Sequence, residues 1–338
     1  MNKKKKVLII VGAVILALWV LSWNWYGKPE KIEYGVSFSK FHSDELNLDW
    51  RKTYLAILDE LKVRNLRLSA HWPMIEPKEG KYNFSELDYQ MREAEKRNAS
   101  VILGVGHRLP GWPECHAPDW VEGLSPGDHE PNLLKYVETV VNRYKNSPSL
   151  RYWQIEKEVF LMFFSRASCK QHNEISKELL KKEIALVRWL DPAHPILITD
   201  SGELGTWFNA YKAGDVFGTS LYLYVWNQKI GPFKYPLIPT FFKIKHNLVR
   251  FMLGDKPAMI IELSSEPWLL QPIITAPIDV QLDRMGIDKL SEMIDFSSKT
   301  GFDMIYLWGA EWWYWLKLNG YSEHWERAQE LFTTPENL

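Results

Sequence analysis

The strongest constraint on the fold of this 338-residue chain is a repeated alternation of strand-like and helix-like segments. Eight short runs rich in Val, Ile and Leu carry the strand signal, at 34–38, 65–70, 100–105, 150–155, 195–199, 215–221, 258–263 and 302–308. Helical periodicity marks the segments 50–62, 86–97, 132–145, 175–190, 206–212, 241–253, 285–298 and 322–331, the second behind a capping box of Ser85 and Asp88. Because no glycine-rich dinucleotide-binding turn follows the first run, eight such repeats predict a closed α/β (β/α)8 TIM barrel.

The composition suits one large domain and excludes some classes of partner. A hydrophobic content of 46% permits a large core, and a formal net charge of -1 gives no reason to expect nucleic acid binding. The chain has 17 tryptophans, and each buried indole needs a partner for its N–H group. We therefore expect most of them in the core and some in an open cleft, in a monomer that needs no cofactor.

The first residues have the pattern of a membrane-targeting segment. Four lysines at positions 3–6 precede the uncharged run 7–23, which is near the shortest length that spans a bilayer. A positive flank predicts a cytoplasmic N-terminus. We predict that residues 1–26 anchor the protein in the lipid bilayer, that 27–33 form a linker, and that 34–334 form the catalytic domain outside the cytoplasm. A cleaved signal peptide and secretion are the alternative.

Polar and aromatic side chains gather at the C-terminal ends of the predicted strands, where the sites of such barrels form. They are Arg67, His71 and Trp72 at the second strand, His107 and Arg108 at the third, Lys157 and Glu158 at the fourth, Tyr222 and Tyr224 at the sixth, Glu262 at the seventh, and Trp308 and Glu311 at the eighth. We predict that these residues form one rim that binds substrate.

Two glutamates in this set end apolar strands, where a carboxylate without a partner is costly. Glu158 follows the run 150–155, and Glu262 lies in the motif Ala258-Met-Ile-Ile-Glu262-Leu. Two carboxyl groups that meet across a barrel mouth are the minimal apparatus for cleaving a glycosidic bond, since one protonates the leaving oxygen and the other attacks the anomeric carbon. Glu156 has the same strand parity as Glu158, but Glu158 lies nearer the mouth.

Four motifs carry a family resemblance: Arg67-Leu-Ser-Ala-His-Trp72, Trp153-Gln-Ile-Glu-Lys-Glu158, Ile260-Ile-Glu262-Leu and Tyr306-Leu-Trp308-Gly-Ala-Glu311. From 34 to 331 the chain resembles clan A, the retaining glycoside hydrolases built on the TIM barrel, with the cellulase-like family 5 as the nearest member. The resemblance implies that Glu158 is the acid/base and Glu262 the nucleophile. It also implies that Arg67 and Tyr222 hydrogen-bond the nucleophile and that Trp308 is a platform for sugar.

Lys157 departs from the family pattern, which has an asparagine before the acid/base. An ammonium beside Glu158 would lower the pKa of that carboxyl, whereas a general acid needs a raised pKa. Three functions stay open. The first is a membrane-tethered, extracytoplasmic retaining glycoside hydrolase that acts on β-linked oligo- or polysaccharides. The second is a glycan-binding barrel with weakened or lost activity, and the third is a metal-dependent barrel hydrolase.

The only two cysteines, Cys115 and Cys169, follow the third and fourth predicted strands. Loops after consecutive strands are neighbours in a barrel, so an exported domain would join these two residues in a disulfide. Two free thiols are the alternative. His107, Cys115 and His116 lack further ligands at a spacing typical of zinc sites, so we predict no metal.

Overall fold

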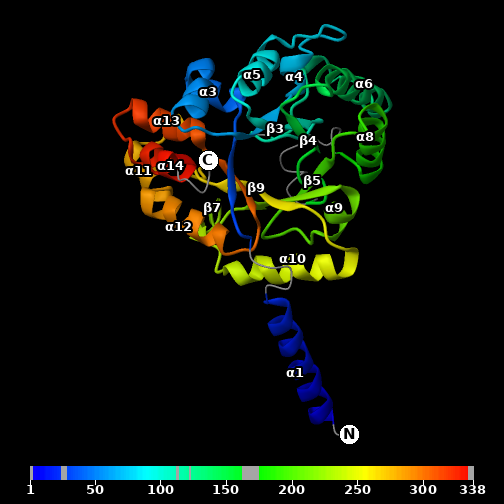
Figure 1. Cartoon of the computed structure of the whole chain (residues 1–338), viewed down its shortest axis with the longest axis vertical. Helices are drawn as coiled ribbons and strands as arrows, with labels where there is room; N and C mark the ends of the chain where they lie inside the picture. Colours follow the sequence, from blue (N-terminus) through cyan, green and yellow to red (C-terminus); the bar gives the residue numbers. More distant parts are fainter. Residues whose placement is uncertain (1–2, 24–28, 112–113, 122, 162–174, 334–338) are drawn as a thin grey trace.

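The computed structural model describes residues 3–23, 29–111, 114–121, 123–161 and 175–333. Parallel strands close into a barrel in the order β1-β10-β9-β6-β5-β4-β3-β2 (Figure 1). Their bounds are β1 Glu33–Ser37, β2 Asn65–Ser69, β3 Ser100–Val105, β4 Leu150–Ile155, β5 Ile196–Asp200, β6 Val216–Leu221, β9 Ala258–Ser264 and β10 Met304–Trp308. The predicted (β/α)8 TIM barrel is confirmed.

Helices surround the barrel at the predicted places. They are α3 Trp50–Asp59, α5 Ser85–Glu95, α6 Pro126–Tyr144, α8 Lys177–Leu190, α9 Phe208–Ala213, α10 Pro239–Leu253, α12 Ile287–Ser298 and α14 Glu323–Thr333. Short helices that the sequence did not predict lie after the strands: α2 Lys40–Glu45, α4 Trp72–Ile75, α11 Ile278–Arg284 and α13 Ala310–Leu318. The predicted capping box is wrong, because Ser85 is already helical and its backbone N–H donates to the side chain of Asn83 at 3.1 Å.

The barrel strands are buried on both faces, which explains their nearly continuous apolar sequence. The barrel interior is filled by Ile102, Leu197, Val216, Met259, Ile261, Met304 and Tyr306. The ring of Tyr306 requires a glycine opposite it, since a Cβ atom on Gly35 would lie 2.6 Å from that ring. A second, larger apolar layer fills the space between the barrel and the helices.

Tryptophan contributes mainly to the core. Trp72, Trp153, Trp207, Trp312, Trp313 and Trp325 are each less than 2% exposed. Their indole nitrogens find partners: Trp153 donates to Asp191 at 2.8 Å, for example. Trp268, which follows β9, is 42% exposed instead. Six of the 17 tryptophans are thus fully buried in the core, whereas Trp268 presents an exposed aromatic face.

An antiparallel hairpin interrupts the barrel repeat after β6. It consists of β7 (Tyr224–Asn227) and β8 (Gly231–Lys234), with Tyr224 opposite Lys234. The sequence analysis did not predict it. The hairpin places Tyr224, one of the predicted rim residues, outside the barrel wall.

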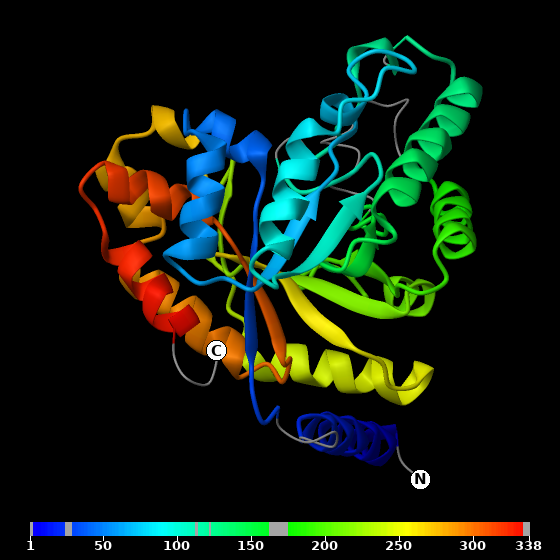
Figure 2. The ribbon, with the colours of Figure 1, turned by 45° about the horizontal axis from the view of Figure 1, so that its top comes forward.

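The N-terminal helix α1 (Lys3–Leu21) lies next to α10, near the end of the barrel where β1 begins (Figures 1 and 2). The side chain of Asn247 on α10 donates to the carbonyl oxygens of Leu21 at 2.8 Å and Trp23 at 2.9 Å. Among the described residues, no helix combines the length and the apolar character needed to cross a membrane. The predicted transmembrane helix is therefore not supported.

Candidate active site

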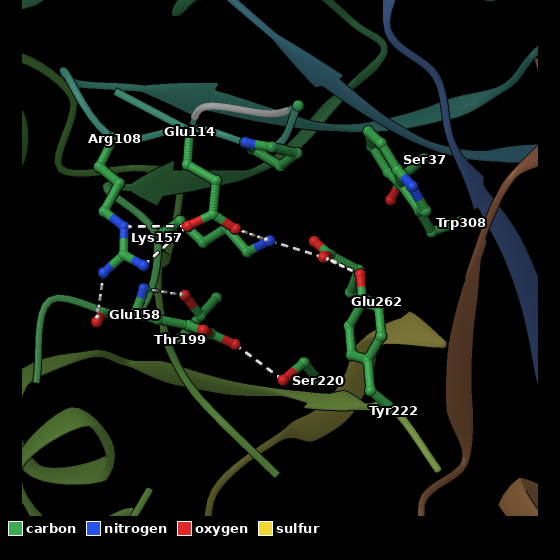
Figure 3. A network of polar contacts seen from close by, with 12 residues as sticks. Ser37, Arg108, Glu114, Lys157, Glu158, Thr199, Ser220, Tyr222, Glu262 and Trp308 are labelled. Carbon is green, nitrogen blue, oxygen red and sulfur yellow. Dashed lines mark hydrogen bonds and ion pairs between the residues drawn. The ribbon is translucent and has the colours of Figure 1, made fainter. Parts of the chain in front are cut away.

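Glu262 lies within β9 near its C-terminal end and is 1% exposed. Its Oε2 accepts a hydrogen bond from Arg67 Nη1 at 2.5 Å. Its Oε1 accepts from Lys157 Nζ at 2.6 Å and from the Tyr222 hydroxyl at 2.5 Å (Figure 3). Burial alone would raise the pKa of Glu262, but the charges of Lys157 and Arg67 outweigh burial and hold this pKa at about 2. The carboxyl group is therefore ionised at ordinary pH.

Lys157 bridges two carboxylates at the centre of the site. Its Nζ lies 2.8 Å from Oε1 of Glu114, in addition to its contact with Glu262 (Figure 3). Glu114 also accepts from Arg108 Nη2 at 2.7 Å, and Arg108 Nη1 donates to the carbonyl oxygen of Glu158 at 2.9 Å. Burial alone would lower the pKa of Lys157, but the two carboxylates raise it, so the side chain stays an ammonium.

Glu158 lies three residues after the end of β4 and is held by β5 and β6. Its Oε1 accepts from the Ser220 hydroxyl on β6 at 2.7 Å, and its backbone N–H donates to the Thr199 hydroxyl on β5 at 3.0 Å (Figure 3). In the barrel order, β5 and β6 separate β4 from β9. Ser220 and Thr199 thus belong to the part of the wall that lies between Glu158 and Glu262.

The pKa of Glu158 is raised, opposite in direction to that of Glu262. Burial is the main cause, and the positive charge of Lys157 opposes it without reversing it. The charge of Glu262 adds to the rise, which places the two carboxyl groups within electrostatic reach of each other. The expected lowering by Lys157 does not prevail, because burial raises this pKa more than the ammonium lowers it, and the charge of Glu114 adds to the rise.

Glu156 and Glu158 differ in environment, although they share strand parity. Both have backbone φ angles in the left-handed region, 57° and 49°, so the alternation of the strand ends at this point. The Glu156 carboxylate accepts the backbone N–H groups of His107 at 2.7 Å and Arg108 at 2.6 Å. Its charge and burial raise the pKa of Glu183, on helix α8 outside the barrel. Glu156 therefore faces the helix layer, which favours Glu158 as the acid/base.

Three other predicted rim residues make packing contacts. The indole of Trp72 stacks on Tyr136 of α6 with ring centroids 5.3 Å apart. The ring of His107 packs against His129 of α6 at 5.3 Å. The Nε2 atom of His71 lies 2.9 Å from the carbonyl oxygen of Pro110 in the loop after β3. Since Pro110 has only that oxygen to offer, His71 is the donor. The structure does not bring these three side chains together with Glu262.

Trp308 and Glu311 lie on the β10 side of the site. The Trp308 indole donates to Glu266 at 2.7 Å and stacks on His42 with ring centroids 5.5 Å apart. Figure 3 shows Trp308 beside Ser37, on the same side as Glu262. Glu311 lies in the first turn of α13 and accepts the backbone N–H of Ser39 at 2.6 Å. Glu311 thus fixes the loop after β1, and burial raises its pKa to about 7.

Sequence reasoning missed Glu114, which holds both Lys157 and Arg108. It lies in the loop after β3 with a φ angle of 69°, and no strand or helix pattern marks it. Ser220 on β6 was also missed. It lies two residues before Tyr222, so the alternation of side chains along the strand could have indicated that both face the same side.

Glu203 supports Tyr222 from the loop after β5. Its carboxylate accepts the backbone N–H of Tyr222 at 2.7 Å, and burial raises the pKa of Glu203 to about 8.

Cys115, next to Glu114, is disulfide-bonded. The chain has one other cysteine, Cys169, which lies outside the described residues. Across the described part of the chain, no group of three or more His, Cys, Asp or Glu side chains is arranged to hold a metal ion.

Comparisons with known proteins agree with this geometry. Residues 40–129 match the beta-galactosidase family of glycoside hydrolase family 42. Beta-galactosidase BgaA of Clostridium cellulovorans is 25% identical over 214 residues, which cover 57% of this chain and 31% of that protein. Part of the chain is thus similar in sequence to glycoside hydrolases of the beta-galactosidase class. The sequence matches are to beta-galactosidases, whereas family 5 was the expected nearest member of clan A.

Solved structures share the barrel fold. Xylanase 10B from Thermotoga maritima has a TM-score of 0.55 and 18% identity, covering 82% of this chain and 83% of that chain. GH5_18 from Bifidobacterium longum has a TM-score of 0.57 and 13% identity, covering 82% of this chain and 70% of that chain. Beta-galactosidase LacA of Lactobacillus acidophilus is 26% identical over 140 residues, which cover 36% of this chain but 20% of that protein. The chain thus spans less than a third of the length of the two curated relatives named here.

Proposed function

We propose that this chain is a retaining glycoside hydrolase of β-linked glycans, with Glu262 as the nucleophile and Glu158 as the acid/base. The observation that carries the proposal is the opposite pKa shift of two buried carboxyl groups at one barrel mouth. Lys157 and Arg67 hold the pKa of Glu262 at about 2 against the effect of burial, whereas burial raises that of Glu158. Carboxyl pairs whose environments separate their pKa values in this way divide the roles of base and acid.

The double displacement follows from these protonation states. The Glu262 carboxylate attacks the anomeric carbon while Glu158 gives its proton to the glycosidic oxygen, so the leaving group departs as an alcohol and an ester joins the sugar to Glu262. The Glu158 carboxylate then takes a proton from water, whose oxygen attacks the anomeric carbon and releases Glu262. Two inversions give net retention. Arg67 and Tyr222 orient the Glu262 carboxylate for this reaction.

The relatives supply the substrate class to test first. The curated relatives named above are beta-galactosidases, so β-galactosides are the proposed substrates. The test is hydrolysis of a panel of aryl β-glycosides, with β-galactoside as the lead, by the purified chain and by Glu262→Gln. We expect turnover by the parent and a loss of several powers of ten in the variant. Glu330→Gln, on the exposed face of α14, is the matched control.

A second candidate, a barrel that binds glycans without efficient turnover, is favoured by the three hydrogen bonds that Glu262 accepts. Lys157 and Tyr222 both bond Oε1 of Glu262, and Arg67 bonds Oε2, so both oxygens of the nucleophile are engaged. Such a carboxylate is a weaker nucleophile than one with a free oxygen. Measurable glycan binding with no hydrolysis by the parent chain would select this candidate.

We also propose that the barrel works outside the cytoplasm, attached to a membrane through its N-terminal segment. The disulfide at Cys115 supports an oxidising compartment. Apolar side chains on α1, such as Val14 and Trp19, are 51% and 54% exposed, which supports contact with lipid. Fractionation of cells expressing the full chain, with thiol counting under denaturing conditions, tests both points. A cytoplasmic protein with two free thiols would contradict them.

A further inference from the structure

A cavity lies between the β7–β8 hairpin, Trp268 after β9, and the residues Arg284 and Lys289 of α11 and α12. Its volume is about 200 Å³. Cavities that enclose drug-sized ligands measure ~300–1,000 Å³, so this one fits a single monosaccharide unit. The residues that matter for its chemistry are three aromatic side chains and three cations: Tyr224, Phe233, Trp268, Lys234, Arg284 and Lys289.

Trp268 connects this cavity to the nucleophile. Its indole packs edge-on against the ring of Tyr222, with ring centroids 5.2 Å apart and an interplanar angle of 90°. The hydroxyl of Tyr222 in turn donates to Glu262 at 2.5 Å. A glycan unit in the cavity is therefore one aromatic residue away from the unit that reacts at Glu262. The exposed face of Trp268 and the rings of Tyr224 and Phe233 suit the apolar C–H face of a sugar.

The side chains that line the cavity carry an excess of positive charge, which favours an anionic ligand. Its lining contains Lys234, Arg284 and Lys289 and no acidic side chain. Lys234 is paired with Glu292, and Arg284 Nη1 lies 2.8 Å from the carboxylate of Asp283. The ammonium of Lys289 donates to the carbonyl oxygen of Asp283 at 2.5 Å and lies over the Tyr224 ring at 5.2 Å. Three cations thus face two carboxylates, which leaves a positive excess of one at a site with aromatic walls.

We propose that this cavity is a subsite for a uronic acid unit of the glycan, next to the unit bound over Glu262. This inference rests on the proposed function as a glycan-cleaving enzyme and extends it to acidic substrates. The aromatic rings contact the sugar face, while Lys289 and Arg284 bind the carboxylate, since charge-assisted hydrogen bonds of this kind are stronger than neutral ones.

The test compares the binding of methyl β-glucuronide with that of methyl β-glucoside by ligand-observed NMR titration of the Glu262→Gln chain. We expect the glucuronide to bind at least about fivefold more tightly at low salt, with a smaller preference at high salt because exposed charges are screened. Lys289→Gln in the same background should abolish the preference. Lys229→Gln makes the same charge change in the exposed turn of the hairpin and should keep it.

Equal affinities, no detectable binding of either sugar, or a preference that survives Lys289→Gln would each overturn the subsite. Because binding is measured in a variant without the nucleophile, the outcome is independent of catalysis. Absence of aryl β-glycoside hydrolysis by the parent chain, with the glucuronide preference intact, would remove the proposed function and leave the subsite standing.

Discussion

The Nζ atom of Lys157 lies 2.6 Å from Oε1 of Glu262, so the residue that replaces the family's asparagine forms an ion pair with the proposed nucleophile. The same ammonium reaches Glu114 on its other side. The pKa of Glu158 is raised in spite of this neighbouring ammonium, because burial outweighs its charge and Glu114 and Glu262 add to the rise. Lys157 is also the residue whose charge lowers the pKa of the proposed nucleophile most strongly.

Lys157→Asn tests this effect. Lys157 is the charge that lowers the pKa of Glu262 most strongly, so its removal should raise this pKa from about 2 towards the ordinary range. The acid limb of the pH profile of kcat/KM should move to higher pH by at least about one unit. Rates at pH 3 and at pH 6, on an aryl β-galactoside, provide the measurement. An unchanged acid limb would show that Lys157 does not act on Glu262.

The alkaline limb should report Glu158. This residue must be protonated for the first step, and burial raises its pKa above 4.5, so activity should fall as pH rises through that raised value. Glu262 is ionised well below this range and contributes nothing to the fall. In Glu158→Gln the limb should disappear and kcat/KM should drop about 10²–10⁴-fold. A variant with an intact alkaline limb would assign the acid/base to another group.

Glu114→Gln tests a positioning role for a residue outside the reacting pair. The charge of Glu114 helps to raise the pKa of Glu158, and its carboxylate holds Lys157 and Arg108. We expect the alkaline limb to shift to lower pH and kcat/KM to fall about tenfold. A purely structural role would reduce the rate at every pH without moving the limb. Glu79→Gln, on an exposed turn, is the control.

Glu183 and Glu156 predict a pH-dependent stability that is separate from catalysis. Burial raises the pKa of Glu156 to about 7 and that of Glu183 well above its ordinary value. The folded state therefore binds more protons than the unfolded state above pH ~4.5, and this contribution to stability is lost as pH rises through the folded pKa values. Between pH 5 and pH 8 the free energy of unfolding should fall by roughly 1–3 kcal/mol.

Glu183→Gln should flatten that dependence, since one neutral partner remains beside Glu156. Urea unfolding of the parent and the variant at the two pH values measures the difference. A parent whose stability is the same at pH 5 and pH 8 would contradict the proposed burial of this acid pair.

The barrel and the positions of its carboxylates were predictable because buried strands have a recognisable apolar sequence pattern. β9 is buried along its whole length and reads as an apolar run broken by Glu262, which marks the carboxylate as exceptional. Ends of parallel strands meet at one edge, so Arg67, Tyr222 and Glu262 were expected together, and the structure joins them.

The contacts of Lys157, the orientation of Glu156 and Glu158, and the hairpin after β6 could not be predicted, because they depend on three-dimensional geometry and not on a local sequence pattern. The direction of the Lys157 side chain is fixed by Glu114, which comes from a loop more than forty residues away in the chain. The left-handed backbone at Glu156 and Glu158 ended the strand parity and turned the two carboxyl groups apart. The β7–β8 hairpin, with its cationic cavity, is an insertion that a barrel repeat does not predict.

The most direct test of the account is to trap the covalent intermediate. The purified chain is incubated with a 2-deoxy-2-fluoro-β-galactosyl fluoride, digested, and mapped by tandem mass spectrometry. We predict one fluorogalactosyl group, esterified to Glu262, and loss of activity in step with its appearance. A label on a different residue, or steady hydrolysis of aryl β-galactosides with no label after prolonged incubation, would contradict it.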